Sequence, residues 1–373
     1  MIELVDITKK YGDFVAVDQI SLKIKQGEVC VLLGPSGCGK STTLKMINRM
    51  LEPTSGSVFI DGQNVRELKP ELLRRKIGYV IQYVGLFPHM TVSENIGIVP
   101  KLLGWEKEKI ARRTAELLEL IGLDPGLYGS KYPQELSGGE AQRIGVARAL
   151  AADPPILLMD EPFGAVDPLT REILQTEFVK IQRELKKTVV FVTHDLEEAI
   201  RVAVRIVLMR DGRLVQHDTP ENILAHPKNR FVHDFIGADR ALKRLSRFPV
   251  SNIMRKAPTV SRSDDLFEAS RRIEEKGFRF LWVVDENQGL MGWIDTRLIK
   301  TEKNPEDAIT QIEVGRIAVS RDSTCKTALS RMLGEGIKVI PVVDESLRVI
   351  GEISLADIEK LTEEVSHTWQ ERG

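Results

Sequence analysis

A glycine-rich loop constrains the fold of this chain more than any other feature of its sequence. The segment Val29–Leu33 is continuously apolar, as a buried parallel strand is, and Ser41–Met50 has the composition of a helix. The pattern G-x-x-x-x-G-K-S follows the strand and extends into the start of the helix. It is formed by Gly34-Pro35-Ser36-Gly37-Cys38-Gly39-Lys40-Ser41-Thr42. The glycines let backbone N–H groups point at phosphate oxygens, and the helix start favours negative charge. The sequence therefore predicts a phosphate-binding P-loop, with Lys40 near the β and γ phosphates and Ser41 as a ligand of Mg²⁺.

A second acidic motif follows another apolar segment. Ile156–Met159 predicts a buried strand, and Asp160 and Glu161 come directly after it. A carboxylate at a strand end beside a P-loop can bind Mg²⁺ through the water molecules of its coordination shell. We therefore predict that Asp160 holds the metal. Glu161 is then placed to act as the general base for the attacking water. The alternative is an ordinary acidic strand end.

A third motif predicts a second helix start that can bind phosphate. Ser137, Gly138 and Gly139 precede the predicted helix Ala141–Leu150, with Ser137 as its N-cap and two glycines that expose backbone N–H groups. One small sheet does not need two such sites for one ATP. A head-to-tail dimer accounts for both, because each subunit's second site then covers the ATP that the other subunit holds.

The remaining pattern of residues 1–238 alternates strands and helices. A further apolar segment, Val189–Val192, predicts another buried strand, and Glu106–Ile121 has apolar residues at helical spacing. This alternation favours an α/β fold, in which helices cover a parallel sheet.

Taken together, these motifs resemble those of the ATP-binding subunit of ABC transporters, over residues 1 to about 238. The segment Leu136–Glu140 resembles the family signature, which usually has Gln where this chain has Glu140. The resemblance implies a P-loop NTPase fold with a helical subdomain, and ATP and Mg²⁺ as cofactors.

The resemblance also implies roles for residues outside the three motifs. Tyr11 matches the aromatic residue that stacks on adenine, and Gln82 matches the glutamine that senses Mg²⁺ and the nucleophilic water. Gly164–Asp167 resembles the dimer-contact loop, which gives Asp167 a contact with the second subunit. His194 matches the histidine that contacts the γ-phosphate.

The segment Gly85–Val92 follows Gln82 and bears on the partner. In transporter ATPases this stretch lies near the helical subdomain that receives a coupling helix from the membrane subunit. That favours an importer over a DNA-repair or translation ATPase. Packing inside the helical subdomain is the alternative for Phe87 and Met90.

The C-terminal part contains an internal repeat with a period of 59 residues. Matching segments are Val260–Arg262 with Val319–Arg321, Val283–Glu286 with Val342–Glu345, Gly277 with Gly336, and Gly292 with Gly351. Each copy predicts strand, helix, strand, turn, strand and helix. One copy is too small to bury its apolar face alone, so we expect the two copies to pack together.

The two copies, at about 250–305 and 309–365, resemble a tandem pair of CBS domains. In that family Ser/Thr-x-x-Asp after the last strand often holds an adenosine ribose. The second copy has this pattern at Ser354 and Asp357, whereas the first copy has Asp295-Thr296-Arg297-Leu298, which departs from it. An ABC subunit followed by two CBS domains resembles the ATPase of importers for glycine betaine, carnitine or choline.

Bulk composition narrows the function further. The formal net charge of −1 gives no case for nucleic acid binding, and the three cysteines (Cys30, Cys38 and Cys325) form no CxxC pair. The longest apolar runs are far shorter than the roughly 20 residues of a membrane span. The resemblance implies a peripheral protein on the cytoplasmic face of the inner membrane, a homodimer that works with permease subunits and an extracytoplasmic solute-binding protein.

Several alternatives remain open from the sequence. The chain contacts no solute by itself, so an ABC importer ATPase for another solute or a non-transport ABC ATPase also fits. The CBS pair could sense ionic strength, bind an adenine nucleotide or cyclic dinucleotide near Asp357, or only dimerise. The basic segment 239–249 predicts a linker with helical character, either as a solvated connector or in contact with acidic lipid head groups.

Overall fold

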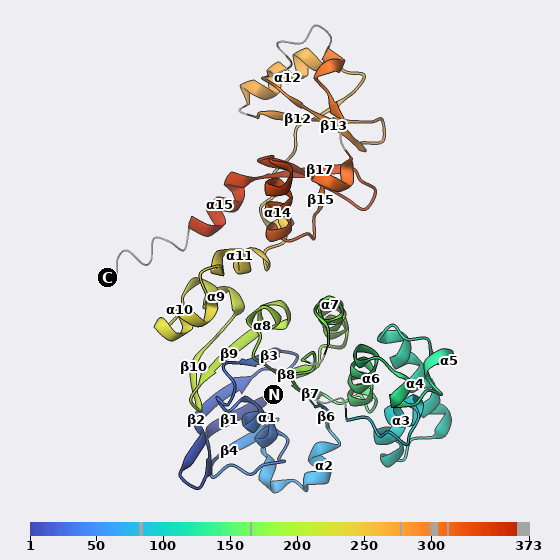
Figure 1. The fold of residues 1–373 in the computed structure, drawn as a ribbon, viewed down its shortest axis with the longest axis vertical. Helices are drawn as coiled ribbons and strands as arrows, with labels where there is room; N and C mark the ends of the chain where they lie inside the picture. Colours follow the sequence, from blue (N-terminus) through green and yellow to red (C-terminus); the bar gives the residue numbers. More distant parts are fainter. Residues whose placement is uncertain are drawn as a thin grey trace. The chain divides into compact units, whose positions relative to one another are not determined.

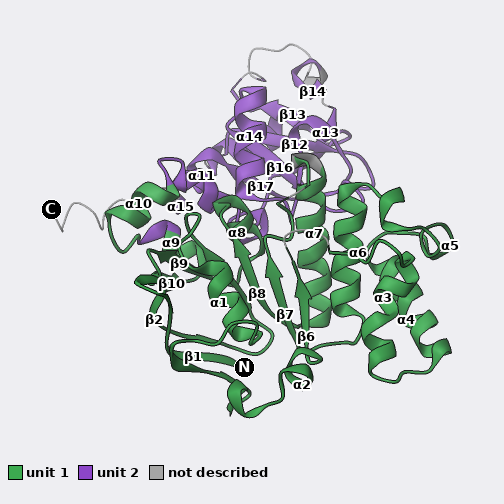
Figure 2. Cartoon of the chain, turned by 60° about the horizontal axis from the view of Figure 1, so that its bottom comes forward, with its two compact units in different colours: residues 1–223, 227–236 green, residues 224–226, 237–373 purple. Residues whose placement is uncertain are grey.

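The computed structural model describes residues 1–81, 85–164, 166–276, 278–297, 299, 305–311 and 313–363. Gln82, Ala165, Gly277 and Leu298, which carry predictions above, lie outside the described residues. The chain divides into two compact units (Figure 2), and each is described here by itself. Unit 1 comprises residues 1–223 and 227–236, and unit 2 comprises residues 224–226 and 237–373.

A six-stranded sheet forms the centre of unit 1 (Figure 1). In spatial order its strands are β10 (Arg213–Asp218), β9 (Arg205–Arg210), β3 (Val29–Leu33), β8 (Thr188–Thr193), β7 (Ile156–Asp160) and β6 (Ile77–Val80). All pairs are parallel except that of β10 with β9. Every residue of β3, β7 and β8 is buried, as expected of a parallel sheet covered by helices. The three strands predicted from apolar runs are confirmed.

A second, antiparallel sheet lies in the same unit. Its strands in spatial order are β2 (Phe14–Ile24), β1 (Ile2–Tyr11), β4 (Ser55–Ile60) and β5 (Gln63–Asn64). Apolar side chains of β1, β2 and β4 share one hydrophobic core with those of β3, β7 and β8. The two sheets therefore form one packed body.

Among the described residues of unit 1, six α-helices lie beside its sheets and outside the separate helical layer of residues 92–150. They are α1 (Lys40–Ile47), α2 (Pro70–Arg74), α7 (Pro168–Leu185), α8 (Leu196–Val202), α9 (Pro220–Ala225), of which the last two residues belong to unit 2, and α10 (Arg230–Ile236). Helix α1 contacts β7 and β8. It ends before the predicted Met50 because Arg49 has a left-handed backbone with φ 51°.

Four helices form a separate layer, here called the helical lobe. They are α3 (Val92–Leu102), α4 (Lys107–Leu120), α5 (Pro125–Tyr128) and α6 (Gly138–Leu150), and α6 contacts β6 of the central sheet. The helix predicted at Glu106–Ile121 is confirmed as α4, with Glu106 as its N-cap residue. Among the described residues, no helix combines the length and the apolar character that crossing a bilayer requires.

Unit 2 contains the two repeats as two small sheets. The first has the order β11 (Thr259–Ser261), β12 (Phe280–Val284), β13 (Leu290–Asp295) and β14 (Thr310–Gln311), and the second β15 (Val319–Ser320), β16 (Val339–Val343) and β17 (Val349–Ser354). The helices are α11 (Arg240–Leu245), α12 (Leu266–Glu275), α13 (Val314–Ile317), α14 (Cys325–Glu335) and α15 (Leu355–Glu363). Val260 pairs with Val283 as Val319 pairs with Val342, so the register repeats too.

Each repeat of unit 2 contributes a backbone segment that pairs with the sheet of the other repeat. The sequence did not reveal this pairing. β14, at the start of the second repeat, pairs with β13 of the first. Arg255, which precedes β11 of the first repeat, forms an isolated bridge with Glu352 in β17 of the second. An ideal Cβ on Gly292 would lie 2.7 Å from the Thr310 carbonyl oxygen, and one on Gly351 would lie 2.9 Å from that of Arg255. Both matching glycines are therefore required by this close approach.

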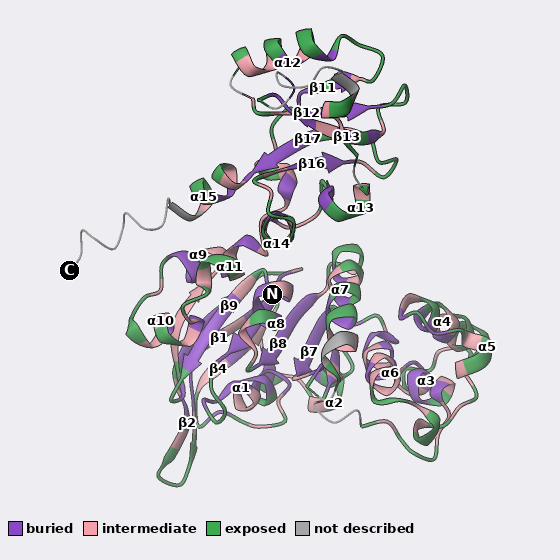
Figure 3. Ribbon diagram, turned by 45° about the horizontal axis from the view of Figure 1, so that its top comes forward, coloured by how far each residue is buried: buried purple, intermediate pink, exposed green. Residues whose placement is uncertain are grey.

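The interior of unit 2 confirms that the repeats pack together (Figure 3). Each repeat has its own hydrophobic cluster, and a third cluster is shared by residues of both. Its buried members are Trp282, Leu290, Ile317, Ala318 and Val343. Neither repeat would bury these side chains alone.

Candidate functional site

Three parallel strands end at the same edge of the central sheet, and each leads into predicted site residues. β3 continues into the glycine loop, β7 ends in Asp160 and is followed by Glu161, and β8 is followed by His194. In doubly wound sheets, ligands bind at the carboxyl ends of such strands. The topology therefore brings residues that are far apart in sequence to one place.

The backbone of the loop requires glycine at two positions. Gly34 has φ 152° and Gly39 has φ 101°, in the region that other residues avoid. An ideal Cβ on Gly34 would lie 2.2 Å from the Met209 carbonyl oxygen, and one on Gly39 would lie 2.5 Å from that of Ala16. The loop is therefore held tightly between β9 and β2, which fixes the direction of its N–H groups.

The Lys40 side chain lies inside the loop rather than in solvent. Its ammonium group donates hydrogen bonds to the carbonyl oxygens of Gly34 at 2.7 Å and Pro35 at 2.9 Å. The residue is only 6% exposed. A cation held at this depth is the charge that phosphate groups in the loop require.

Ser41 and Asp160 come together as the sequence predicts for a metal site. The Ser41 hydroxyl donates to Asp160 Oδ1 at 2.8 Å. Burial raises the pKa of the Asp160 carboxyl, and the Ser41 hydrogen bond partly opposes that shift. Among the described residues, no group of three or more His, Cys, Asp or Glu side chains could hold a metal. Two hard oxygen ligands fit Mg²⁺, which commonly takes one or two protein ligands and completes its shell with phosphates and water.

Glu161 and His194 face each other across adjacent strands. Glu161 Oε1 lies 3.2 Å from His194 Nδ1, and the Glu161 N–H donates to the Val192 carbonyl oxygen at 3.0 Å. The side chains are 19% exposed for Glu161 and 59% for His194. The carboxylate is therefore anchored and partly shielded, while the imidazole is open to a ligand. This geometry suits Glu161 as a general base and His194 as a group that positions the ligand.

Tyr11 ends β1 at the hairpin to β2, where Gly12 has φ 57°. Its ring is about half exposed, and the Lys9 ammonium lies 5.3 Å from the ring centroid. The same hairpin carries Ala16 against Gly39 of the loop. An open aromatic face on a strand that contacts the loop is suited to stack on a base.

The third motif caps α6 as predicted, and the structure explains its departure from the family pattern. The Ser137 hydroxyl and Glu140 form a capping box, in which the Ser137 N–H donates to Glu140 Oε2 at 2.7 Å. The Tyr128 hydroxyl donates to Glu140 Oε1 at 2.6 Å, a contact that the sequence did not indicate. Gly138 and Ser137 are exposed and Gly139 is partly exposed, so this helix start is open to a ligand.

The other predicted residues of unit 1 have separate places. Asp167 is the N-cap of α7, where its side chain accepts from the Thr170 N–H at 3.0 Å, and it is exposed. Gln82 lies outside the described residues, so its predicted role stays a prediction. Close to Gln82 in sequence, the Gly85 carbonyl oxygen accepts a hydrogen bond from Arg148 of α6 at 2.8 Å.

In unit 2, Ser354 and Asp357 form a hydrogen-bonded pair at the start of α15. Asp357 accepts from the Ser354 hydroxyl and from its N–H, and the Asp357 N–H donates back to the hydroxyl at 3.2 Å. In the first repeat, Asp295 instead pairs with Arg279 at 2.8 Å. These hydrogen bonds cap the start of α15, so the geometry of the pair is explained without a bound ribose.

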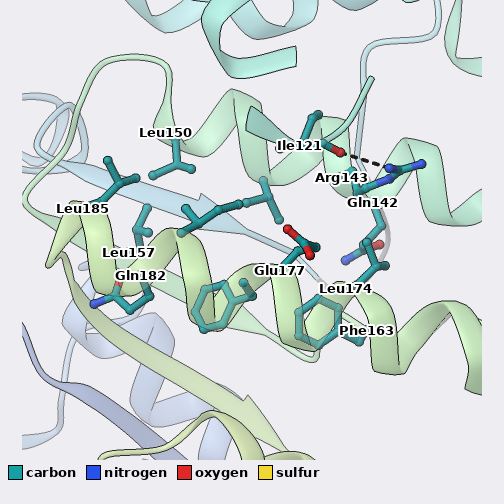
Figure 4. A pocket seen from close by; sticks show the side chains of 13 residues that line it. Ile121, Gln142, Arg143, Leu150, Leu157, Phe163, Leu174, Glu177, Gln182 and Leu185 are labelled. Atoms are coloured by element: carbon teal, nitrogen blue, oxygen red, sulfur yellow. Dashed lines mark hydrogen bonds between the residues drawn. The ribbon is translucent and has the colours of Figure 1, made fainter. Parts of the chain in front are cut away.

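Two of the hollows among the described residues of unit 1 bear on the assignment of the site. One is a cavity of about 40 Å³ between α6, β7 and α7, lined by Leu157, Phe163 and Phe178 among others (Figure 4). It is too small for a nucleotide. The other is an open groove of about 810 Å³ on the helical lobe, between α3 and α4, with Met90, Gly97 and Ile110 in its walls. Its size fits a helix or loop of a partner protein.

Comparison with known families agrees with this arrangement. The sequence profile described as "ABC transporter" matches residues 17–164, and the profile described as "CBS domain" matches residues 250–301 and 312–363.

Relatives of known name are similar over nearly the whole chain. The glycine betaine/carnitine/choline transport ATP-binding protein OpuCA of Bacillus subtilis is 48% identical, with 96% of this chain and 95% of that protein covered. The osmoprotectant import ATP-binding protein OsmV of Salmonella typhimurium is 45% identical, with 95% and 94% covered. A solved dimer of an ATP-binding cassette with ADP and Pi is 36% identical, with a TM-score of 0.54, and covers 59% of this chain and 99% of its own.

Proposed function

The chain belongs to the ATP-binding proteins of ABC transporters that carry a C-terminal CBS pair, and we propose that it drives import of quaternary amines such as glycine betaine, carnitine or choline. The ATPase part rests on one arrangement: Ser41 lies 2.8 Å from Asp160 beside Lys40, and Glu161 lies 3.2 Å from His194 at the same sheet edge. We assign the solute from relatives that are similar over nearly the whole chain and are named for these compounds.

The residues of the site divide the work of hydrolysis. Loop N–H groups and Lys40 hold the β and γ phosphates, and Tyr11 stacks on adenine. Ser41 and Asp160 would hold Mg²⁺, which would neutralise developing charge on the phosphates. Glu161 accepts a proton as the water oxygen bonds to the γ-phosphorus and the bond to the β–γ bridging oxygen breaks. His194 donates to a γ-phosphate oxygen and keeps the carboxylate in place.

A head-to-tail homodimer completes this site. α1 contacts the central strands β7 and β8, whereas α6 contacts β6 and the lobe helices α3 and α4, so one chain presents its two phosphate-binding helix starts on different elements. In the dimer, Ser137 and Gly139 of one chain reach the γ-phosphate held by the other, and Asp167 lies at the contact. The relative with bound ADP and Pi is a dimer.

The helical lobe carries the contact with permease subunits. Its groove between α3 and α4 is large and partly apolar, as a docking surface for a membrane partner's cytoplasmic helix requires. The chain then works on the cytoplasmic face of the membrane, in a complex with an extracytoplasmic solute-binding protein. The CBS pair regulates transport, with ionic strength, an adenine nucleotide or dimerisation as its input.

The test is ATP-dependent uptake of labelled glycine betaine, carnitine and choline in vesicles that contain the chain with its permease and binding protein. Uptake should require this chain and fail with Lys40→Ala, whereas the exposed Lys186→Ala should transport normally. ATP-driven uptake of an unrelated solute only would overturn the substrate assignment, and a chain that purifies without any membrane partner would overturn import.

A further inference from the structure

Unit 2 contains a cleft of about 230 Å³ in which aromatic side chains of the first repeat meet charged side chains of the second. Phe280 and Trp282 come from β12, and Trp293 comes from the neighbouring strand β13. Facing them are Arg316 of α13 and Glu335 at the end of α14. The cleft is smaller than the roughly 300–1,000 Å³ of sites for drug-sized ligands, so it fits a small molecule.

The aromatic rings form a fixed wall. Phe280 and Trp293 meet edge to face, with ring centroids 5.1 Å apart and planes at 75°. Trp282 is 2% exposed, and its Nε1–H donates to Glu352 Oε2 at 2.8 Å, which fixes the indole as the floor. The Arg279 guanidinium lies 5.1 Å from the Phe280 centroid, so this wall already attracts one cation.

The second repeat does not carry these rings at the matching positions. At the matching positions of the second repeat, Phe280 is replaced by Val339, Trp282 by Pro341 and Trp293 by Glu352. The paired strands keep the same register, since Trp282 pairs with Trp293 as Pro341 pairs with Glu352. The aromatic side chains are therefore particular to the first repeat, where Trp282 is part of the core shared by both repeats and Phe280 and Trp293 are partly exposed.

The charges of the cleft favour a cation. Arg316 binds Glu335 through both carboxylate oxygens, at 3.1 and 2.9 Å, so its charge is already compensated. Glu313, at the rim, has no ion-pair partner among the side chains that the structure describes. Among the residues that the structure describes, the lining therefore carries one carboxylate in excess, which disfavours phosphate groups and favours a positive ligand.

We propose that this cleft binds a small quaternary ammonium compound, with its methyl groups against Trp282 and Trp293 and its charge facing Glu313. Aromatic faces attract such ions without the hydrogen bonds that other cations require. The choice of ligand rests on the proposed function, which supplies these compounds inside the cell. The cleft would then report the concentration of the imported solute to the regulatory unit.

The test is calorimetric titration of the full chain with choline to ~10 mM, where weak sites saturate. We expect saturable binding, and binding at least ~10-fold weaker for 3,3-dimethyl-1-butanol, which has the same shape without charge. Trp293→Leu should weaken choline binding roughly 3- to 30-fold and Trp293→Phe less, while Phe267→Leu, an exposed aromatic residue of the same repeat, should bind normally.

A surface variant keeps the test valid if Trp293→Leu fails to fold. Glu313→Lys should weaken choline binding, whereas Glu345→Lys, an exposed turn residue outside the cleft, should not. No saturable binding, equal affinity for the uncharged compound, or binding of AMP alone that Trp293→Leu abolishes would each overturn the proposal. Uptake in vesicles is read separately, so import without cleft binding would overturn this inference and leave the proposed function standing.

Discussion

At the scale of single residues, Glu161, the proposed general base, has an unusual backbone conformation. Its φ of 45° is left-handed, which costs a non-glycine residue roughly 1–3 kcal/mol. The N–H bond to Val192 and the contact with His194 hold it there. The carboxylate is thereby fixed at the edge where phosphates bind, as a general base requires.

We predict that Glu161→Gln keeps ATP binding but lowers turnover by about 100-fold or more, because the amide cannot accept the proton from water. Phosphate release and binding of a fluorescent ATP analogue measure the two effects. Glu184→Gln, an exposed position on α7, is the matched control and should turn over normally. Turnover close to that of the wild type would remove the general-base assignment.

Glu140 is a second residue whose chemistry the contacts explain. The Tyr128 hydroxyl and then the Ser137 N–H hold the pKa of Glu140 below its usual value. The charged form is thus favoured in the folded state. Its contribution to stability is present above the usual pKa of about 4.3 and is lost as pH falls through the lowered folded pKa.

We therefore predict that Glu140→Gln is less stable than the wild type at pH 7 and that the difference shrinks as the pH falls below about 4. The glutamine keeps the hydrogen-bonding shape of the capping box but not its charge. Urea unfolding at a series of pH values measures this. A constant difference from pH 7 to pH 3 would contradict it.

At the scale of elements, the exchange of leading segments makes the two repeats of unit 2 depend on each other. β14 completes the sheet of the first repeat, and Arg255 bridges to the sheet of the second. Gly292 and Gly351 allow both approaches. Removing one repeat would leave the other with an unpaired strand edge and an open apolar face.

We predict that Gly292→Ala destabilises unit 2 by roughly 1–3 kcal/mol, because the added methyl group would meet the Thr310 carbonyl and push β14 away. Thermal or urea unfolding measures the loss. Gly334→Ala is the control: it lies in α14 with nothing within 4 Å of its ideal Cβ, so it should be neutral or stabilising. Equal stability of the two variants would contradict the proposed contact.

At the scale of the whole molecule, the site of one chain is only half of the proposed catalytic unit. Ser137 and Gly138 lie at an exposed helix start, where the capping box uses the Ser137 side chain and leaves other N–H groups for a ligand. In the proposed dimer, a second copy related by a two-fold axis would supply the matching half.

We predict that Glu161→Gln forms a dimer with ATP and that adding Ser137→Arg abolishes the dimer without weakening nucleotide binding. The larger cationic side chain would occupy the place of the second chain's γ-phosphate. Light scattering with and without ATP measures mass. Ser346→Arg, at an exposed turn of unit 2, should leave the dimer intact. A dimer that persists with Ser137→Arg would exclude the head-to-tail arrangement.

The sequence by itself determined the local elements and the residue types of the candidate site. Loop glycines, the strand ending in Asp160 and the N-cap at Ser137 are read within a few neighbouring residues, since turn geometry, strand burial and capping are local properties. The 59-residue repeat was also visible in the sequence, because its two copies match without a gap.

Only the tertiary structure decided which distant residues meet. Strand order placed Asp160 beside Ser41 and Glu161 beside His194, and packing joined Tyr128 to Glu140. The exchange of β14 and the aromatic cleft of Trp282 and Trp293 likewise depend on contacts between the repeats. Such contacts follow from the closure of long loops around a shared core, which leaves no pattern in any one segment of the chain.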